Sequence, residues 1–246
     1  MKLSRYLSLL TACCCCLILA WPKACPNDPF ENPNDPAAEN DAYIPKPNGL
    51  LIEDFDDGKI PNLLGYCHEI FLDDLGPFAI IDTSYISDRK DVLRGGGKSW
   101  RIHFNVSKEP PLGKDTYCGY VELLTGNDLC KRPNAGLFNL AVLNLTFLTF
   151  WVKTESPDID FEMALKDIKN NETNPKKRVK DNYLTPGILW RKVKIPITDL
   201  LPNQSGPPVN LQELREINFS FSYRYSQQPR APLTGTIYLD EIAFER

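Results

Sequence analysis

The sequence predicts an all-β protein whose strands form a two-sheet antiparallel sandwich, or jelly roll. Many short segments alternate apolar with polar residues, and turn signals such as DDG, GGG and TG separate them. The 21 prolines and 14 glycines favour this punctuated pattern over long helices. With 246 residues and 42% hydrophobic content, the chain can bury one substantial core, which argues against disorder throughout.

Residues 1–25 have the layout of a bacterial-type export signal. Lys2 and Arg5 precede an apolar run that extends from Leu7 to Trp21. Because this run is shorter than the roughly 20 residues of a comfortable membrane span, we expect an export signal, the alternative being a short uncleaved anchor. We therefore expect the protein to be secreted or held in the cell envelope.

Two cysteines of this leader are candidates for lipidation. Cys13 ends the string LTAC, which resembles the lipobox of bacterial lipoproteins, although apolar residues follow it. Cys25 lies beyond the apolar run, although Pro22 and Lys23 depart from the lipobox pattern. Lipidation at either cysteine would make the protein an outer-membrane or periplasmic lipoprotein.

Residues 26–48 are interpreted as an extended tether that leads to a folded domain at residues 49–246. The tether has six prolines and five acidic residues, and it has too little apolar surface to order itself. Loss of the leader would remove three basic residues and leave 25 against 32 acidic ones, a net charge of about −7. We therefore expect no nucleic-acid partner, because a basic footprint is absent.

Several segments of the domain have the patterns of strands. Four of them alternate apolar and polar residues as half-buried strands do: 100–106, 159–165, 192–195 and 219–223. Residues 143–153 are apolar at both parities, which is typical of a central strand covered on both faces. Residues 210–217 offer a brief helical turn.

The last strand, TIYLDEIAFER, contains a shift in its alternation. Its first apolar pair, Ile237 and Leu239, lies on one parity, whereas the next apolar pair lies on the other. The shift falls at Asp240 and Glu241. A β-bulge is therefore predicted at these two carboxylates.

Eight segments follow one another along the domain: EDFDDG, GGGKSWRIHFNV, YCGYVELL, LTFLTFWVKTES, FEMALKD, LWRKVKIPITDL, LREINFSFSY and GTIYLDEIAF. Their order resembles that of the galactose-binding-like jelly rolls, and it is most similar to the family-eleven carbohydrate-binding modules and their secreted bacterial relatives. The resemblance covers essentially the whole folded part. It implies a module that binds a glucan-type polysaccharide on a concave sheet face.

The resemblance also implies a structural calcium ion near the chain ends. In the family, an opening acidic stretch and an acidic residue of the last strand lie around that ion, and the matching positions here are Glu53, Asp54, Asp56 and Asp240. Calcium takes six to eight oxygen ligands, and a bulged strand offers a carboxylate and an untethered carbonyl. The alternative is that these acids are solvated turn residues, and Glu241 is expected to be exposed.

Two tyrosines in the string YCGYV are the first candidates for sugar contacts, because a tyrosine ring combines a flat apolar surface with a polar tip. The resemblance places the family's tyrosine at Tyr117. The alternation favours Tyr120, because it lies opposite Val121 and Leu123, whereas Tyr117 would need a bulge at Gly119. Both tyrosines are kept as candidates.

Five further candidates for the sugar-binding surface are Glu122, Trp190, Tyr223, Arg224 and Tyr225. The charged ones lie on polar faces, as Glu162 does, and could bond sugar hydroxyls, although charged strand residues are usually only solvated. The tryptophan is either a platform or a cap at a sheet edge, and the two tyrosines either contact sugar or close the core. Phe221 replaces a tyrosine that is frequent in the family, so the resemblance does not specify the glycan.

The three cysteines beyond the leader are expected to include a disulfide if the protein is exported. A bridge between Cys118 and Cys130 would close a short loop and leave Cys67 over, although Cys67 could equally take either partner. No CxxC or Cys/His spacing suggests zinc, and with only two histidines in the chain the ligands of a metal would be oxygens.

The sequence carries no motif of a hydrolase. Neither GxSxG nor HExxH occurs, and one binding-module-like unit fills the folded part. We therefore expect a non-catalytic module whose partner is a polysaccharide or oligosaccharide. Two alternatives are a protein-interaction scaffold on the same fold and a jelly-roll polysaccharide lyase or hydrolase, whose carboxylates would come from distant strands.

Overall fold

The computed structural model describes residues 49–60, 62–73, 79–106, 115–125, 137–223 and 234–246. All of them belong to one compact unit. The predicted leader and tether lie outside the described residues, as do Cys13, Cys25, Cys130, Arg224 and Tyr225. Within the described ranges, no helix has the length and apolar character needed to cross a membrane.

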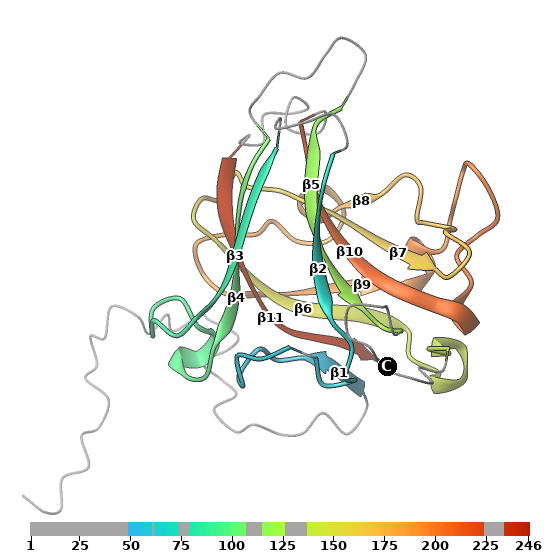
Figure 1. Cartoon of the computed structure of the whole chain (residues 1–246), viewed down its shortest axis with the longest axis horizontal. Helices are drawn as coiled ribbons and strands as arrows, with labels where there is room; N and C mark the ends of the chain where they lie inside the picture. The colour runs from blue at the N-terminus through green and yellow to red at the C-terminus, as the bar shows by residue number, and fades with distance from the viewer. Residues whose placement is uncertain (1–48, 61, 74–78, 107–114, 126–136, 224–233) are drawn as a thin grey trace, which may run out of the picture. The chain divides into compact units, whose positions relative to one another are not determined.

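One sheet has six strands in the order β3-β4-β11-β6-β9, with β1 paired to β11. These strands are β1 (Gly49–Glu53), β3 (Ile80–Ile86), β4 (Ser99–Asn105), β6 (Phe147–Thr154), β9 (Arg191–Pro196) and β11 (Thr234–Glu245). Every neighbouring pair is antiparallel. The sheet therefore brings the first and last described strands of the domain side by side (Figure 1).

The second sheet has five strands in the order β2-β5-β10-β7-β8, and its neighbouring pairs are also antiparallel. These strands are β2 (His68–Leu72), β5 (Tyr117–Leu123), β7 (Glu162–Asp167), β8 (Lys177–Arg178) and β10 (Leu214–Ser222). Short helical pieces connect the strands: η1 (Leu93–Gly95), η2 (Leu140–Leu143), α1 (Val179–Asn182), η3 (Ile197–Leu200) and η4 (Leu211–Glu213). The predicted two-sheet antiparallel sandwich is confirmed.

The core lies between the two sheets and is rich in phenylalanine. Phe104 of β4 stacks on Phe221 of β10 with 4.1 Å between ring centroids. Phe150 of β6 meets Phe219 of β10 edge-on at 5.3 Å. Because each contact joins a strand of one sheet to a strand of the other, these rings hold the sheets together, in offset or edge-to-face arrangements that aromatic rings prefer.

The predicted bulge in the last strand is confirmed. The pairing of β11 with β6 shifts register between Asp240 and Ala243. Within this interval Glu241 has a positive φ of 43°, which is uncommon for a residue with a side chain. The bulge allows the apolar residues on both sides of it to face the core.

Two of the predicted segments differ from the structure in detail. The helical turn predicted at residues 210–217 is limited to η4, because β10 begins at Leu214. The Asn210 side chain accepts the N–H of Gln212, which accounts for this one short turn. The strand predicted at residues 159–165 begins only at Glu162, because Asp160 accepts backbone N–H groups from Phe161 and Lys180 instead of continuing a ladder.

Candidate functional site

An open groove of about 610 Å³ lies on the outer face of the five-stranded sheet. The alternation of β10 shows why the groove is polar. Its residues Ile217, Phe219 and Phe221 belong to the core, so the intervening polar side chains point outward. Those that line the groove are Glu216, Asn218, Ser220 and Ser222.

A row of paired residues crosses the groove from β2 to β7. Phe71 pairs with Gly119 of β5, Gly119 pairs with Ser220 of β10, and Ser220 pairs with Glu162 of β7. The next pair of β5 and β10 on the same face joins Tyr117 to Ser222. The register therefore places aromatic side chains at one side of the groove and polar side chains across its middle.

The aromatic side of the groove consists of Phe71 and Tyr117. Their ring centroids lie 6.1 Å apart with an angle of 50° between the ring planes. Phe71 is half-buried, and Tyr117 is 36% exposed. The pair therefore presents apolar ring surface to solvent at the edge of the groove.

Gly119 makes room for the Phe71 ring. A Cβ built on Gly119 would overlap both the Phe71 ring and the backbone carbonyl oxygen of Phe219. Glycine is therefore the residue that allows Phe71 to lie across β5 and into the groove.

We expect Gly119→Ala to destabilise the protein. The added methyl group would overlap a ladder carbonyl that cannot move without loss of strand pairing, so we expect a loss of about 1–3 kcal/mol. Urea unfolding measures the loss. Gly96→Ala is the matched control, because a Cβ at Gly96 would meet nothing within 4 Å. Equal stability of the two variants would contradict the close approach at Gly119.

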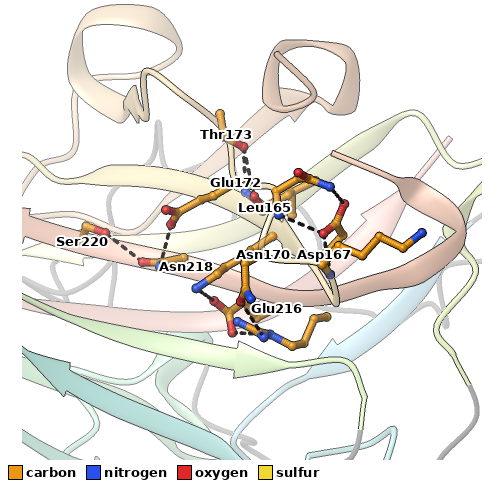
Figure 2. Close-up of polar contacts among 12 residues, drawn as sticks. Leu165, Asp167, Asn170, Glu172, Thr173, Glu216, Asn218 and Ser220 are labelled. Atoms are coloured by element: carbon orange, nitrogen blue, oxygen red, sulfur yellow. Dashed lines mark hydrogen bonds and ion pairs between the residues drawn. The ribbon is translucent and has the colours of Figure 1, made fainter. Parts of the chain in front are cut away.

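The polar side of the groove contains a ring of four hydrogen-bonded side chains. Lys176 donates from Nζ to Ser220 Oγ at 2.9 Å, and Ser220 donates to Asn218 Oδ1 at 2.8 Å. Asn218 Nδ2 donates to Glu172 Oε1 at 3.2 Å, and the same oxygen lies 3.2 Å from Lys176 Nζ. Figure 2 shows Glu172 reaching toward Asn218 on β10, and Asn218 toward Ser220.

Lys176 also connects the two sides of the groove. Its ammonium lies 5.9 Å from the centre of the Phe71 ring, within the range of a cation–π contact. Two other polar contacts fix groove side chains: Ser222 donates to Asp115 at 2.7 Å, and Lys166 pairs with Glu216 at 3.4 Å. The groove therefore combines exposed rings with an ordered set of hydrogen-bonding groups.

Two of the predicted sugar-binding residues lie in the core. Tyr120 and Glu122 are both fully buried, and the tyrosine hydroxyl donates to Glu122. The second Glu122 oxygen accepts Asn62 Nδ2 at 2.5 Å. The predictions for Tyr120 and Glu122 are wrong because β5 is a central strand with buried side chains on both faces, so its alternation does not reveal the outer face.

The burial of Glu122 has an electrostatic consequence. Loss of solvent raises the pKa of its carboxyl to about 8, against the lowering effect of the hydrogen bonds from Tyr120 and Asn62. The charge of Glu53, whose own pKa burial raises to about 7, adds to this effect. These carboxyls lie between the sheets and outside the groove, so they belong to the core rather than to the candidate site.

Trp190 is also placed away from the groove. Only 7% of it is exposed, and it packs with Leu93, Trp151 and Tyr238 on the six-stranded sheet. The prediction of a platform there is wrong, because the side chains of neighbouring strands cover the ring. Tyr223 is half-buried at the end of β10, where its N–H donates to the Thr116 carbonyl, and it does not line the groove.

The predicted disulfide is corrected by the structure. Cys118 is free and buried, and its thiol lies 3.7 Å from the Ile80 carbonyl oxygen. Cys67 is disulfide-bonded. The bridge predicted between Cys118 and Cys130 is therefore wrong, because β5 turns the Cys118 side chain into the core. Burial, with the charge of Asp73, raises the pKa of the Cys118 thiol to about 12.

The predicted calcium ligands do not form one set. Within the ranges that the structure describes, no three acidic, histidine or cysteine side chains make a group that could hold a metal ion. Glu53 is 2% exposed, and its Oε1 accepts the Phe55 N–H at 2.7 Å. Its charge acts on Glu122. The charges of Asp54 and Asp57 act on Glu53 as well, so its role as a calcium ligand stays a prediction.

Asp56 and Asp240 fit the calcium prediction better. They bind consecutive residues at the start of β4: Asp56 Oδ1 accepts the Lys98 N–H at 3.0 Å, and Asp240 Oδ2 accepts the Ser99 hydroxyl at 2.5 Å. Burial raises the pKa of Asp240 well above its usual value, and the charges of Asp56 and Glu241 add to this effect. A buried carboxylate with acidic neighbours needs a proton or a cation.

The other two acids near the bulge have different surroundings. Asp54 Oδ1 accepts the Asp56 N–H at 3.2 Å, as in a turn. Glu241, which was expected to be exposed, is only 8% exposed and pairs with Arg94 at 2.8 Å. That expectation is wrong because the bulge turns the Glu241 side chain onto η1.

Most groove residues were not among the sequence-based candidates, and four of them are central to the site: Phe71, Glu172, Lys176 and Asn218. The sequence carries one signal for part of this set. In the string INFSFS, every second residue is Asn or Ser, and these small polar side chains form the floor of the groove. The other three residues come from distant segments, for which the local pattern gives no signal.

Comparison with known proteins supports a carbohydrate-binding role. The family model of carbohydrate binding domain 30 matches residues 90–246, which is more than half of the chain. No curated protein sequence matches the chain. The resemblance to carbohydrate-binding jelly rolls predicted from the sequence is confirmed, and domain 30 is the family whose model matches.

Several solved structures are similar to this one. One is a family 11 carbohydrate-binding module from Clostridium thermocellum in complex with a β-1,3-1,4-mixed-linked tetrasaccharide. It is 15% identical in sequence, the match covers 80% of this chain and 95% of that chain, and the TM-score is 0.48. Another is the family 30 carbohydrate-binding module of a cellulosomal cellulase of Clostridium thermocellum. It is 17% identical in sequence, the match covers 81% of this chain and 93% of that chain, and the TM-score is 0.42.

A third similar structure is an enzyme. It is a β-1,2-glucanase from Parabacteroides distasonis, with 16% identity and a TM-score of 0.46, and the match covers 81% of this chain but 24% of the enzyme. The family model, which spans β4 to β11, provides the assignment. The chain belongs to the carbohydrate binding domain 30 family.

Proposed function

We propose that the groove on the five-stranded sheet is the carbohydrate-binding surface of this protein and that it binds a polysaccharide or oligosaccharide. The observation that carries the proposal is the presence of the partly exposed rings of Phe71 and Tyr117 and of an ordered polar network in the same groove. The volume of about 610 Å³ is in the range of ligand-binding clefts. Membership of a carbohydrate-binding family supports the same conclusion.

The two sides of the groove would make different contacts with a sugar. An aromatic ring offers a flat apolar surface to the C–H face of a pyranose, and the Tyr117 hydroxyl adds a polar tip. Asn218, Ser220 and Lys176 can exchange hydrogen bonds with sugar hydroxyls, because each has donor or acceptor capacity beyond its contacts within the ring of side chains.

We propose that the module binds its ligand without cleaving it. A glycoside hydrolase needs a carboxylic acid of raised pKa that faces the scissile bond. The described acids whose pKa is raised are Glu53, Asp54, Glu122, Asp160 and Asp240. All five lie outside the groove. In the groove, Glu172 and Glu216 are each paired with a lysine.

Native gel electrophoresis in the presence of soluble polysaccharides tests this proposal. The full chain is run in gels that contain mixed-linked β-glucan, hydroxyethylcellulose, xylan or galactomannan, and we expect retardation by at least one of them. Absence of retardation in every gel would favour the protein-interaction scaffold. Release of reducing ends or unsaturated products from the retarding polysaccharide would favour the hydrolase or lyase.

We also propose that the protein acts outside the cytosol, as the sequence of its leader predicts. The disulfide at Cys67 supports this location, because disulfides persist mainly in oxidising compartments. Expression with the native leader in a bacterial host, followed by fractionation, tests it: we expect the protein in the envelope or periplasm. Labelling with palmitate, compared between Cys13→Ser and Cys25→Ser, identifies a lipidated cysteine, and recovery in the cytosol alone would contradict export.

Calcium near Asp56 and Asp240 remains our proposal for a structural ion. The buried charge of Asp240, with Asp56 beside it, supports a cation there. A ligand that binds only the native state at 100 times its Kd stabilises by about 2.7 kcal/mol, which corresponds to roughly 5–10 °C in Tm for a domain of this size.

We therefore expect a chelator to lower the Tm of the protein by this amount, and added calcium to restore it. Differential scanning fluorimetry with EGTA measures the shift. The Tm of the variant Asp240→Asn should not fall further when EGTA is added. An unchanged Tm of the wild type with EGTA would contradict the calcium proposal.

A further inference from the structure

We infer that Glu172 makes the groove selective for uncharged glycans by neutralising Lys176, an inference that rests on the proposed function of the groove. Lys176 Nζ lies 3.2 Å from Glu172 Oε1 and 2.9 Å from Ser220 Oγ. Glu172 thus fills the position that the carboxylate of an acidic sugar would occupy beside this ammonium.

Lys176 lies where it would meet a bound sugar. Its ammonium contacts Ser220 on one side and lies 5.9 Å from the Phe71 ring centre on the other, and Gly119 is the residue between these two in the sheet. A pyranose stacked on Phe71 would therefore present its substituents to Lys176. A hydroxyl can accept from the ammonium while the Glu172 pair remains, whereas a sugar carboxylate would have to compete with Glu172.

The charges of the groove agree with this role. The described lining has five acidic residues and two lysines. Both lysines are paired with a carboxylate, Lys176 with Glu172 and Lys166 with Glu216. Among the described lining residues, an entering polyuronate would therefore find each cation already neutralised and further carboxylates nearby, which like-charge repulsion disfavours.

The variant Glu172→Gln isolates the charge from the shape. A glutamine oxygen can still accept Asn218 Nδ2, so the ring of side chains is kept, while Lys176 loses its ionic partner. Glu213→Gln is the matched control. Glu213 pairs with Lys169 at 2.8 Å, and this pair lies outside the lining of the groove.

The experiment compares one polysaccharide in two charge states. The probes are the hexose polysaccharide among those in the gels (mixed-linked β-glucan, hydroxyethylcellulose or galactomannan) that retards the full-length wild type most strongly, and the same polysaccharide oxidised at C6 to a polyuronate. We expect the wild type to bind the neutral form more tightly than the oxidised form. We expect Glu172→Gln to bind the oxidised form roughly three- to fivefold more tightly than the wild type does, which corresponds to the free energy of one charge pair near the surface. This gain in affinity for the oxidised form should disappear at 300 mM NaCl, because salt screens the charges. It should also disappear in the double variant Glu172→Gln/Lys176→Met, which lacks the ammonium group.

Three results would overturn the inference. Glu172→Gln could bind the oxidised polysaccharide no better than the wild type, or Glu213→Gln could gain as much, which would indicate a general charge effect. The wild type could also prefer the oxidised form. If no polysaccharide retards the wild type or Glu172→Gln, the proposed function itself fails. If the neutral form retards the protein but Glu172→Gln does not bind the oxidised form more tightly than the wild type, only the role of Glu172 is removed.

Discussion

Replacement of Phe71 and Tyr117 together by alanine should abolish retardation of the full chain by polysaccharide. These rings form the apolar surface at the edge of the groove, and no other aromatic side chain lines it within the described residues. Contacts of this kind dominate interface energies, so we expect each single variant to lose roughly tenfold in affinity and the double variant to lose measurable binding. Affinity electrophoresis and calorimetry measure the losses.

Two controls distinguish a lost contact from a lost fold. Phe147→Ala removes a half-buried ring from β6 on the other sheet, where it contacts Lys194, and should leave binding unchanged. Tyr120→Phe removes the buried hydroxyl that bonds Glu122, and it should alter stability but not affinity. Binding that survives in Phe71→Ala/Tyr117→Ala, with the variant folded, would show that the ligand lies elsewhere.

The unfolding free energy should fall as the pH rises from about 6.5 to about 8. The pKa of Glu122 is raised to about 8 by burial, so the native state holds a proton that the unfolded chain has released. In this range the native state binds more protons than the unfolded state, and stability therefore decreases with pH. One such group gives a slope of up to about 1.4 kcal/mol per pH unit.

Two neighbours of Glu122 set the range in which this slope can be seen. Glu53, with a pKa raised to about 7, acts in the same direction up to that pH. His68 acts in the opposite direction below its ordinary value of 6.5, because burial lowers its pKa to about 4 and the unfolded chain binds the proton first. The decline should therefore be clearest between pH 7 and 8, where Glu122 titrates, and Asp240, whose pKa burial raises well above its usual value, acts in the same direction.

Glu122→Gln tests the assignment of the slope. A glutamine oxygen can still accept from Asn62, and its amide can donate to the Tyr120 oxygen once the hydroxyl, which donates to Glu122 in the structure, has rotated away. The substitution therefore keeps the buried volume and removes the titration. Urea unfolding of this variant from pH 6.5 to 8, in EGTA so that metal binding does not contribute, should give a clearly shallower decline of the unfolding free energy than the wild type shows, because the contribution of Asp240 remains. A wild-type stability that is constant or rises over this range would contradict the protonated core carboxyl.

The fold could be predicted from the sequence because its strands have clear local patterns. The alternation at residues 100–106 corresponds to β4, and the double apolar parity at 143–153 corresponds to the central strand β6. The shift in the last strand marked a real bulge between Asp240 and Ala243. Each of these signals lies within one strand, where the period of side-chain orientation is two and burial decides which face is apolar.

The site could be predicted only in part, because its side chains are brought together by the pairing of distant strands. Tyr117 was found through the resemblance, but the alternation of β5 pointed to Tyr120, since this central strand is buried on both faces. Asn218 and Glu172 are 46 residues apart, and Lys176 and Ser220 are 44 apart. The local sequence contains no signal for such contacts, which depend on the order β10-β7-β8.

The disulfide and the metal site show the same limit. A short sequence separation favoured a bridge at Cys118, yet the direction of its side chain on β5 makes it a core residue. The acids of EDFDDG are adjacent in sequence, but Glu53 is buried, whereas Asp56 accepts the Lys98 N–H next to Ser99, whose hydroxyl bonds Asp240. In both cases the face of the strand decides the role of the residue.

Oxidative footprinting tests the location of the binding surface most directly. Hydroxyl radicals modify exposed aromatic rings, and mass spectrometry gives the extent of modification of each ring with and without the polysaccharide that retards the protein. We expect the ligand to protect Phe71 and Tyr117 and to leave Phe147 on the six-stranded sheet unchanged. Protection of Phe147, with Phe71 and Tyr117 modified to the same extent as in the free protein, would contradict the groove as the carbohydrate-binding surface.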